Sequence, residues 1–85
     1  MITEYKDVCL LCDRPAEHTH HLIFGTAGRK LADEDGLTAP LCHECHAFIH
    51  TNSKGARMSK IIGQMAYEKD HTRQEFMKRY GRSFI

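Results

Sequence analysis

The stretch PLCHECHAFIH, residues 40–50, places two cysteines and three histidines within eleven residues. Cys42 and Cys45 form a Cys-x-x-Cys pair, and a matching pair, Cys9 and Cys12, lies upstream. Two such pairs can supply the four thiolates of a tetrahedral zinc site with Zn–S distances of about 2.3 Å. The sequence therefore predicts one structural zinc ion bound by all four cysteines.

Other uses of these cysteines are open at this point. Free thiols or a redox pair are the simplest alternatives, although a redox site needs only one Cys-x-x-Cys pair. A mixed site could instead combine the second pair with His46 or His50, which would leave Cys9 or Cys12 without a role. The site of four cysteines is preferred because it uses both matched pairs.

The length of 85 residues predicts a single domain spanning 1–85. A chain of this size buries a small core and often needs a metal or a disulfide for stability. Residues 1–8 contain no apolar run of the kind found in secretion signals, and no segment is long enough to span a membrane. We therefore expect a cytoplasmic protein whose thiols stay reduced and bind metal.

Charge is distributed unevenly along the chain. Residues 1–53 contain four basic and eight acidic residues, a net charge of −4, whereas residues 54–85 contain eight basic and three acidic residues, a net charge of +5. A cationic tail beside a metal-binding head is suited to holding a phosphate backbone. An ordinary solvated helix surface would have the same composition, so charge alone does not decide between the two.

Local patterns predict the order of elements in the first half. A cysteine knuckle is expected at 8–15, a strand at 18–24, a loop rich in Gly and Asp at 26–36, a short strand at 37–41 and a helix at 42–50. Pro40 should confine the second strand to a sheet edge. Thr51-Asn52-Ser53, followed by Gly55, should end the helix.

The tail, about residues 56–81, is expected to form two helices. The spacing of Met58, Ile61, Ile62 and Met65 is that of an amphipathic helix. A second helix should begin at the capping box of Thr72 and Glu75 and end at Gly81. We expect the side chains of Met58, Met65 and Met77 to fill the core.

Histidine is abundant, with seven in the chain. His46 and His50 are four residues apart in the predicted helix, so their rings lie on one face and can share a metal ion. His20 and His21 are adjacent in a predicted strand and should point to opposite faces, so only one of them can readily join that ion. Three nitrogen ligands with an open position are typical of a catalytic metal site. The other histidines, His18, His43 and His71, are expected on the surface.

These motifs together resemble HNH endonucleases that contain a four-cysteine zinc site. The resemblance covers about residues 9–50 and is carried by Cys-x-x-Cys, then HHLI at 20–23, then PLCxxCHxxxH at 40–50. It is most similar to the short HNH proteins of bacteria and their phages. It implies an α+β fold: a small zinc-stapled ββα-metal core at about 8–51 with a C-terminal helical extension.

The resemblance also implies a role for each motif residue. His20, His46 and His50 would bind a catalytic divalent metal, His21 would be the general base, and the four cysteines would be structural. The implied substrate is DNA, cut to leave 5′-phosphate and 3′-hydroxyl ends. A phage or recombination protein is a possible partner, and no membrane is involved.

For the catalytic ion, histidine nitrogens favour Mn²⁺, Co²⁺, Ni²⁺ or Zn²⁺ over Mg²⁺. Arg29 and Lys30, beside His21, are candidates for holding a substrate phosphate. The chain departs from the family at Leu37, where an asparagine usually braces the loop; Asp33, Asp35 or Thr38 could take that role. The rival hypothesis is a non-catalytic zinc module that binds nucleic acid or protein.

Overall fold

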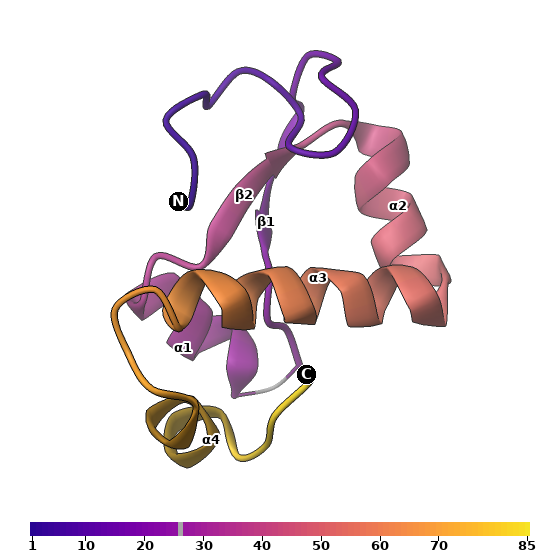
Figure 1. Cartoon of the computed structure of the whole chain (residues 1–85). Coiled ribbons are helices and arrows are strands. Elements are labelled where there is room, and N and C mark those ends of the chain that lie inside the picture. Colours follow the sequence, from indigo (N-terminus) through magenta and orange to yellow (C-terminus); the bar gives the residue numbers. More distant parts are fainter. Residues whose placement is uncertain (26) are drawn as a thin grey trace.

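A two-stranded antiparallel hairpin lies at the centre of the structure. The computed structural model describes residues 1–25 and 27–85, and within them the elements follow the order β1, α1, β2, α2, α3, α4 (Figure 1). Strand β1 (His18–His21) pairs with β2 (Thr38–Leu41), with His20 opposite Ala39. The α+β class expected from the sequence is confirmed.

Pro40 lies in β2 without disrupting the sheet. It is opposite Thr19 in the register, and its carbonyl accepts a hydrogen bond of 2.9 Å from the backbone N–H of Leu10. Proline lacks only the donor, so its carbonyl can still bind a neighbouring segment. The edge position predicted for this strand is confirmed, and the cysteine-bearing N-terminal segment lies along that edge.

A helix replaces most of the loop predicted between the strands. Helix α1 (Gly28–Glu34) occupies the stretch that Gly and Asp content had marked as irregular, so that prediction was wrong; Thr26 lies outside the described residues. Ala32 on this helix is fully buried in a cluster that includes Ile23 and Leu37. The packing of this small apolar face outweighs the weak helix propensity of the local sequence.

Helices α2 (His43–Thr51) and α3 (Ser53–Tyr67) are separated by one residue, Asn52. The Asn52 backbone N–H bonds to the Phe48 carbonyl at the end of α2, and its side chain accepts hydrogen bonds from Lys54 and Gly55 at the start of α3. Asn52 therefore caps both helices. The predicted break is confirmed, but Gly55 belongs to the next helix and does not end the first.

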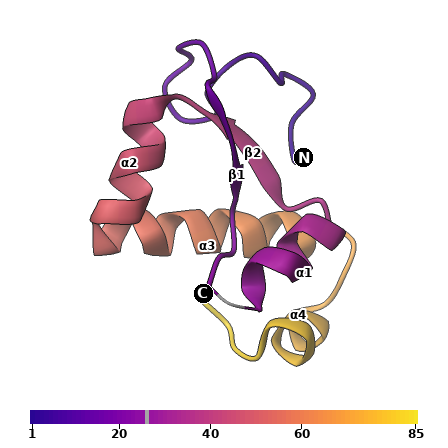
Figure 2. The same ribbon diagram turned by 180° about the vertical axis from the view of Figure 1, so that it is seen from behind.

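Helix α3 is the longest element, and it crosses one end of the hairpin with α2 rising from its N-terminal end (Figures 1 and 2). Its buried residues are Gly55, Ser59, Gly63, Gln64 and Tyr67. Met65, predicted to fill the core, is 59% exposed, whereas Met58 is partly buried. The face that packs is therefore the one with small and polar residues.

Helix α4 (Arg73–Tyr80) begins and ends as predicted. Both hydrogen bonds of the capping box between Thr72 and Glu75 are present, and Gly81 adopts a left-handed φ of 87°. Met77 is 44% exposed, so Phe76, fully buried, is the core residue of this helix. The prediction of Met77 as core filling was wrong.

The buried residues form two clusters at opposite ends of the molecule. One surrounds the cysteines and includes Leu41 and Ile49. The other joins α1, α3 and α4 through Ala32, Tyr67 and Phe76. None of the helices among the described residues is long and apolar enough to cross a membrane.

Candidate metal centres

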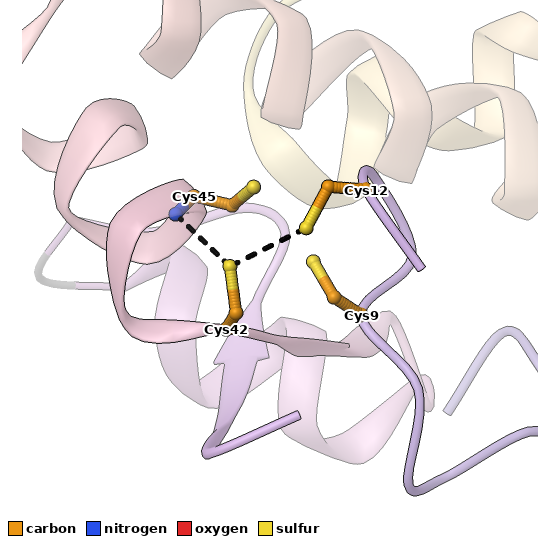
Figure 3. A group of neighbouring side chains, drawn as sticks. All are labelled: Cys9, Cys12, Cys42 and Cys45. Atoms are coloured by element: carbon orange, nitrogen blue, oxygen red, sulfur yellow. Dashed lines mark hydrogen bonds between the residues drawn. The ribbon is translucent and has the colours of Figure 1, made fainter. Parts of the chain in front are cut away.

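The four cysteines come together at one end of the hairpin (Figure 3). Cys9 and Cys12 lie in the N-terminal segment, while Cys42 caps α2 and Cys45 lies in its first turn. Their sulfur atoms all lie within 4.8 Å of one another, and those of Cys12 and Cys42 are 3.5 Å apart. Tetrahedral zinc with Zn–S bonds of about 2.3 Å needs sulfurs about 3.8 Å apart, so the group fits zinc.

The knuckle that presents the first pair is held by its backbone. The Cys9 N–H donates to the Arg14 carbonyl at 2.7 Å, and the Asp13 N–H donates to the Cys9 carbonyl at 3.1 Å. Asp13 has a φ of 64°, in the left-handed region that aspartate tolerates better than most residues. This tight turn directs Cys9 and Cys12 toward the same point.

Burial and neighbouring groups act differently on the Cys9 and Cys45 thiols. Burial works against the Cys9 thiolate, but backbone hydrogen bonds from Cys42 and Leu11 outweigh it and lower the pKa of Cys9 to about 6. Burial and the neighbouring sulfurs raise the pKa of Cys45. The Cys9 thiolate forms readily and the Cys45 thiol resists ionisation, which is the situation that a bound divalent cation relieves.

Three histidines form a second group next to the first. His46 and His50 project from α2 with their Nε2 atoms 3.1 Å apart, and His20 of β1 offers a ring nitrogen within 4.8 Å of both. Zn–N bonds of about 2.0–2.1 Å place tetrahedral ligands about 3.4 Å apart, so this group also fits a divalent metal. The structure keeps the cysteines and these histidines in separate groups, which gives no support to a mixed site.

His20 is the buried member of this group, with 2% of its surface exposed. Its Nε2 lies 2.8 Å from the Ser59 hydroxyl of α3, which in turn donates to the Leu22 carbonyl at 2.7 Å. Burial, and then the proximity of His46 and His50, lowers the pKa of His20 to about 4. Its ring is therefore neutral at cellular pH, as a metal ligand must be.

His21 lies outside that group, although it is the neighbour of His20 in the chain, and is partly exposed. Its Nε2 lies 3.1 Å from Oδ1 of Asp33 on α1. Asp33 was one of three candidates to replace the missing asparagine, and its side chain is the one that hydrogen-bonds to the His21 ring. Helix α1, unforeseen from the sequence, is what brings this carboxylate to the histidine.

A cavity of about 410 Å³ joins these parts. It is lined by Thr19, His20, His21, Phe24, Gly25, Arg29, His46 and His50. Lys30 lies outside this lining, in a neighbouring open depression that it shares with His21, Arg29 and Asp33. Thus the histidine group, His21 and Arg29 face one space, while Lys30 lies at its margin.

Sequence reasoning missed two residues of α3 that contact side chains lining this space. Ser59 contacts His20, and the Lys60 ammonium lies 4.7 Å from the ring centre of Phe24, which lines the cavity. Single serines and lysines in a helix have no distinguishing sequence pattern. Only the crossing of α3 under the hairpin brings them to the site. His18, His43 and His71 are exposed, as expected.

Comparison with known proteins places the chain in a family. Residues 5–78 match the family described as protein of unknown function DUF968, so the chain belongs to that family. The matched segment includes both pairs of cysteines and all the histidines of the second group. No curated protein and no solved structure matches the chain significantly.

Proposed function

We propose that this protein is a metal-dependent endonuclease of the HNH class that hydrolyses phosphodiester bonds in DNA. The observation that carries the proposal is that a group of three histidines fit for a metal faces the same cavity as His21, which is outside that group. A pure binding module has no need for an additional histidine oriented by a carboxylate. The succession β1, β2, α2 supports a ββα-metal core, with α1 inserted between the strands.

The proposed general base is His21. Its Nε2–H can donate to the Asp33 carboxylate, which leaves Nδ1 with the lone pair that accepts a proton from the attacking water. A base oriented by a third group is a common arrangement in enzymes that activate a nucleophile. Asp33 thus acts as a positioning residue.

The remaining functions fall to the metal and to Arg29. A divalent ion held by His20, His46 and His50 would act as a Lewis acid toward the charge that develops on the attacked phosphate. The guanidinium of Arg29, which lines the same cavity, is suited to bind a phosphate oxygen pair. Nitrogen ligands favour Mn²⁺, Co²⁺, Ni²⁺ or Zn²⁺ for this site over Mg²⁺.

A plasmid cleavage assay tests the proposal. Wild-type protein, loaded with zinc at the cysteines, should nick supercoiled DNA when one of these metals is added. His21→Ala should lower the rate by about 10²–10⁴-fold, the range for loss of a general base, with metal binding by calorimetry unchanged. His50→Ala should lose both the second metal and cleavage.

His43→Ala is the matched control, because His43 is an exposed histidine on the same helix and outside the metal group. It should cleave like the wild type. Binding of DNA without cleavage by the wild type, under every metal tested, would favour the non-catalytic zinc module. Loss of metal binding in His21→Ala would make His21 a ligand and contradict its role as base.

A further inference from the structure

Ser59 makes two hydrogen bonds at the centre of the molecule, and its side chain is fully buried. Its hydroxyl donates to the Leu22 carbonyl at 2.7 Å and lies 2.8 Å from Nε2 of His20. These two contacts lie on either side of His21 in the chain. One serine of α3 therefore holds both the side chain before His21 and the backbone after it.

The direction of the second bond follows from the first. A serine hydroxyl has one proton, and a carbonyl oxygen can only accept. With that proton directed to Leu22, the serine oxygen must act as acceptor toward His20. The proton of the neutral imidazole then resides on Nε2, and the lone pair of the ring is on Nδ1.

We propose that Ser59 is a positioning residue that fixes His20 as its Nε2–H tautomer and thereby makes Nδ1 the atom that binds the metal. The other two ligands would bind through Nε2, since the Nε2 atoms of His46 and His50 are the pair that lies 3.1 Å apart. This inference rests on the histidine metal site of the proposed function. It adds Ser59, a residue of α3 that orients a metal ligand although it lies outside the segment formed by β1, β2 and α2.

The tautomer can be read directly from long-range ¹H–¹⁵N correlation spectra of histidine-labelled protein that holds zinc at the cysteines only. In the wild type, His20 should be protonated at Nε2. Added Zn²⁺ should shift the resonance of His20 Nδ1 and those of Nε2 in His46 and His50. Protonation of His20 at Nδ1 in the wild type, or a shift at its Nε2 on zinc binding, would overturn the proposal.

Substitution tests whether the serine is responsible. Ser59→Ala should give a mixture of His20 tautomers and weaken Zn²⁺ binding at the histidines by about 10–100-fold, the usual cost of losing a hydrogen-bond partner of a ligand. Ser59→Thr, which keeps a hydroxyl, should restore the single tautomer. Ser53→Ala, at an exposed serine of the same helix, should change neither property.

A folded Ser59→Ala protein with an unchanged His20 tautomer and unchanged zinc affinity would contradict the proposal. If that variant does not fold, the spectra of the wild type alone decide whether the proposal is correct. None of these measurements involves DNA. If the wild type shows the expected tautomer and zinc shifts but cleaves no plasmid, the nuclease proposal fails and the role of Ser59 stands. If the wild type cleaves plasmid but His20 binds zinc through Nε2, the nuclease proposal stands and the role of Ser59 fails.

Discussion

The burial of His20 couples the stability of this protein to pH. The ring is almost fully enclosed between β1, α2 and α3, and desolvation, with His46 and His50 nearby, lowers its pKa to about 4. In the unfolded chain its pKa returns to about 6.5. Between these values the unfolded state binds more protons, so falling pH favours unfolding.

We therefore predict that the free energy of unfolding decreases as pH falls from 7.5 to 5, with His20 responsible for about 2 kcal/mol of the loss. Urea titration at both pH values, with zinc at the cysteines and the histidine site empty, measures it. His20→Gln should show a smaller pH dependence than the wild type, while His43→Gln, at an exposed position, should match the wild type. Equal pH dependence in all three would exclude His20 as the source. Any loss of zinc from the cysteines at low pH affects the stability of all three proteins equally, so it does not alter the comparison between them.

The grouping of His20, His46 and His50 could be inferred from residue spacing, because α-helical and strand periodicities fix which rings share a face. The residues that hydrogen-bond to the histidines lining the cavity could not be inferred from the sequence. Ser59 and Asp33 are brought to them by α3 and α1, whose packing depends on contacts distant in the sequence. Serine and aspartate are also common on any helix surface, so neither stands out.

At the level of elements, the junction of α2 and α3 decides how the second metal group is supported. Gly55 follows the shared cap Asn52, and a Cβ built on it would lie 2.8 Å from the Phe48 carbonyl oxygen and 2.9 Å from the Phe48 ring. That close approach holds the two helices at a fixed angle. His46 and His50, on α2, are thereby fixed relative to Ser59 on α3.

Gly55→Ala is therefore expected to destabilise the protein by about 1–3 kcal/mol, the usual cost of overpacking. In an unobstructed helix the same change stabilises by about 0.5–1 kcal/mol, so the sign of the effect is diagnostic. Urea denaturation of the zinc-loaded protein measures it. Ser53→Ala, two residues earlier and exposed, is the control and should have little effect. A more stable Gly55→Ala protein would show that the two helices are not tightly packed there.

Hydrophobic periodicity located α3 but identified only part of the face that packs. Of the predicted apolar stripe Met58, Ile61, Ile62 and Met65, the first three are half-buried and Met65 is exposed, whereas Ser59 and Gly63 are buried. Gly63 lies against Leu22 and Ile23, where a Cβ would be 3.0 Å from their side chains. A helix that approaches neighbouring residues this closely needs small side chains, and hydropathy does not register that requirement.

Across the whole molecule, the cysteine group stabilises the end that has the smaller apolar cluster. Leu41 and Ile49 pack directly against Cys9 and Cys42, so core and metal site are one unit. Helix α2 carries Cys45 and His46 as neighbours. Loss of a zinc ion bound by the cysteines should therefore disorganise the histidine group as well.

Cys12→Ser tests this dependence. Cys12 is exposed, so its replacement removes little packing and acts through the lost ligand. We expect the variant to purify without its zinc, to lose most helical circular dichroism and to bind no metal at the histidines, because zinc binding and folding are coupled in small domains. Tyr5→Ser, at a side chain 73% exposed in the same segment, should keep one zinc per chain by metal analysis. A folded, zinc-free Cys12→Ser protein would contradict the prediction.

The cationic tail is only partly available to a polyanion. Arg73 pairs with Glu68, and Arg79 pairs with Glu34 and Asp35, which ties α4 to other elements. Lys60 differs, since its ammonium lies between the rings of Phe24 and Phe84 at 4.7 and 5.5 Å. Those contacts hold a positive charge beside Phe24, which lines the histidine cavity.

We predict that Lys60→Gln weakens DNA binding and lowers the salt slope of log Kobs by about 0.9, the value for one lost phosphate contact. Fluorescence anisotropy in the His21→Ala background, which prevents cleavage, measures both. Lys69→Gln, at an exposed lysine in the turn after α3, is the control and should keep the wild-type slope. Equal slopes for the two variants would show that Lys60 makes no phosphate contact.

The face that α3 presents to the hairpin also determines which substitutions the helix tolerates. In a saturation mutagenesis library, conspicuous apolar positions such as Met65 should accept polar residues freely, because that side chain is largely exposed. Gly55 and Gly63 should accept almost none, since an added Cβ meets a neighbouring backbone or side chain, and Ser59 should accept only threonine, which keeps the hydroxyl that bonds to His20. Hydropathy therefore does not predict tolerance along this helix, because its most restricted positions are the small residues of the packed face.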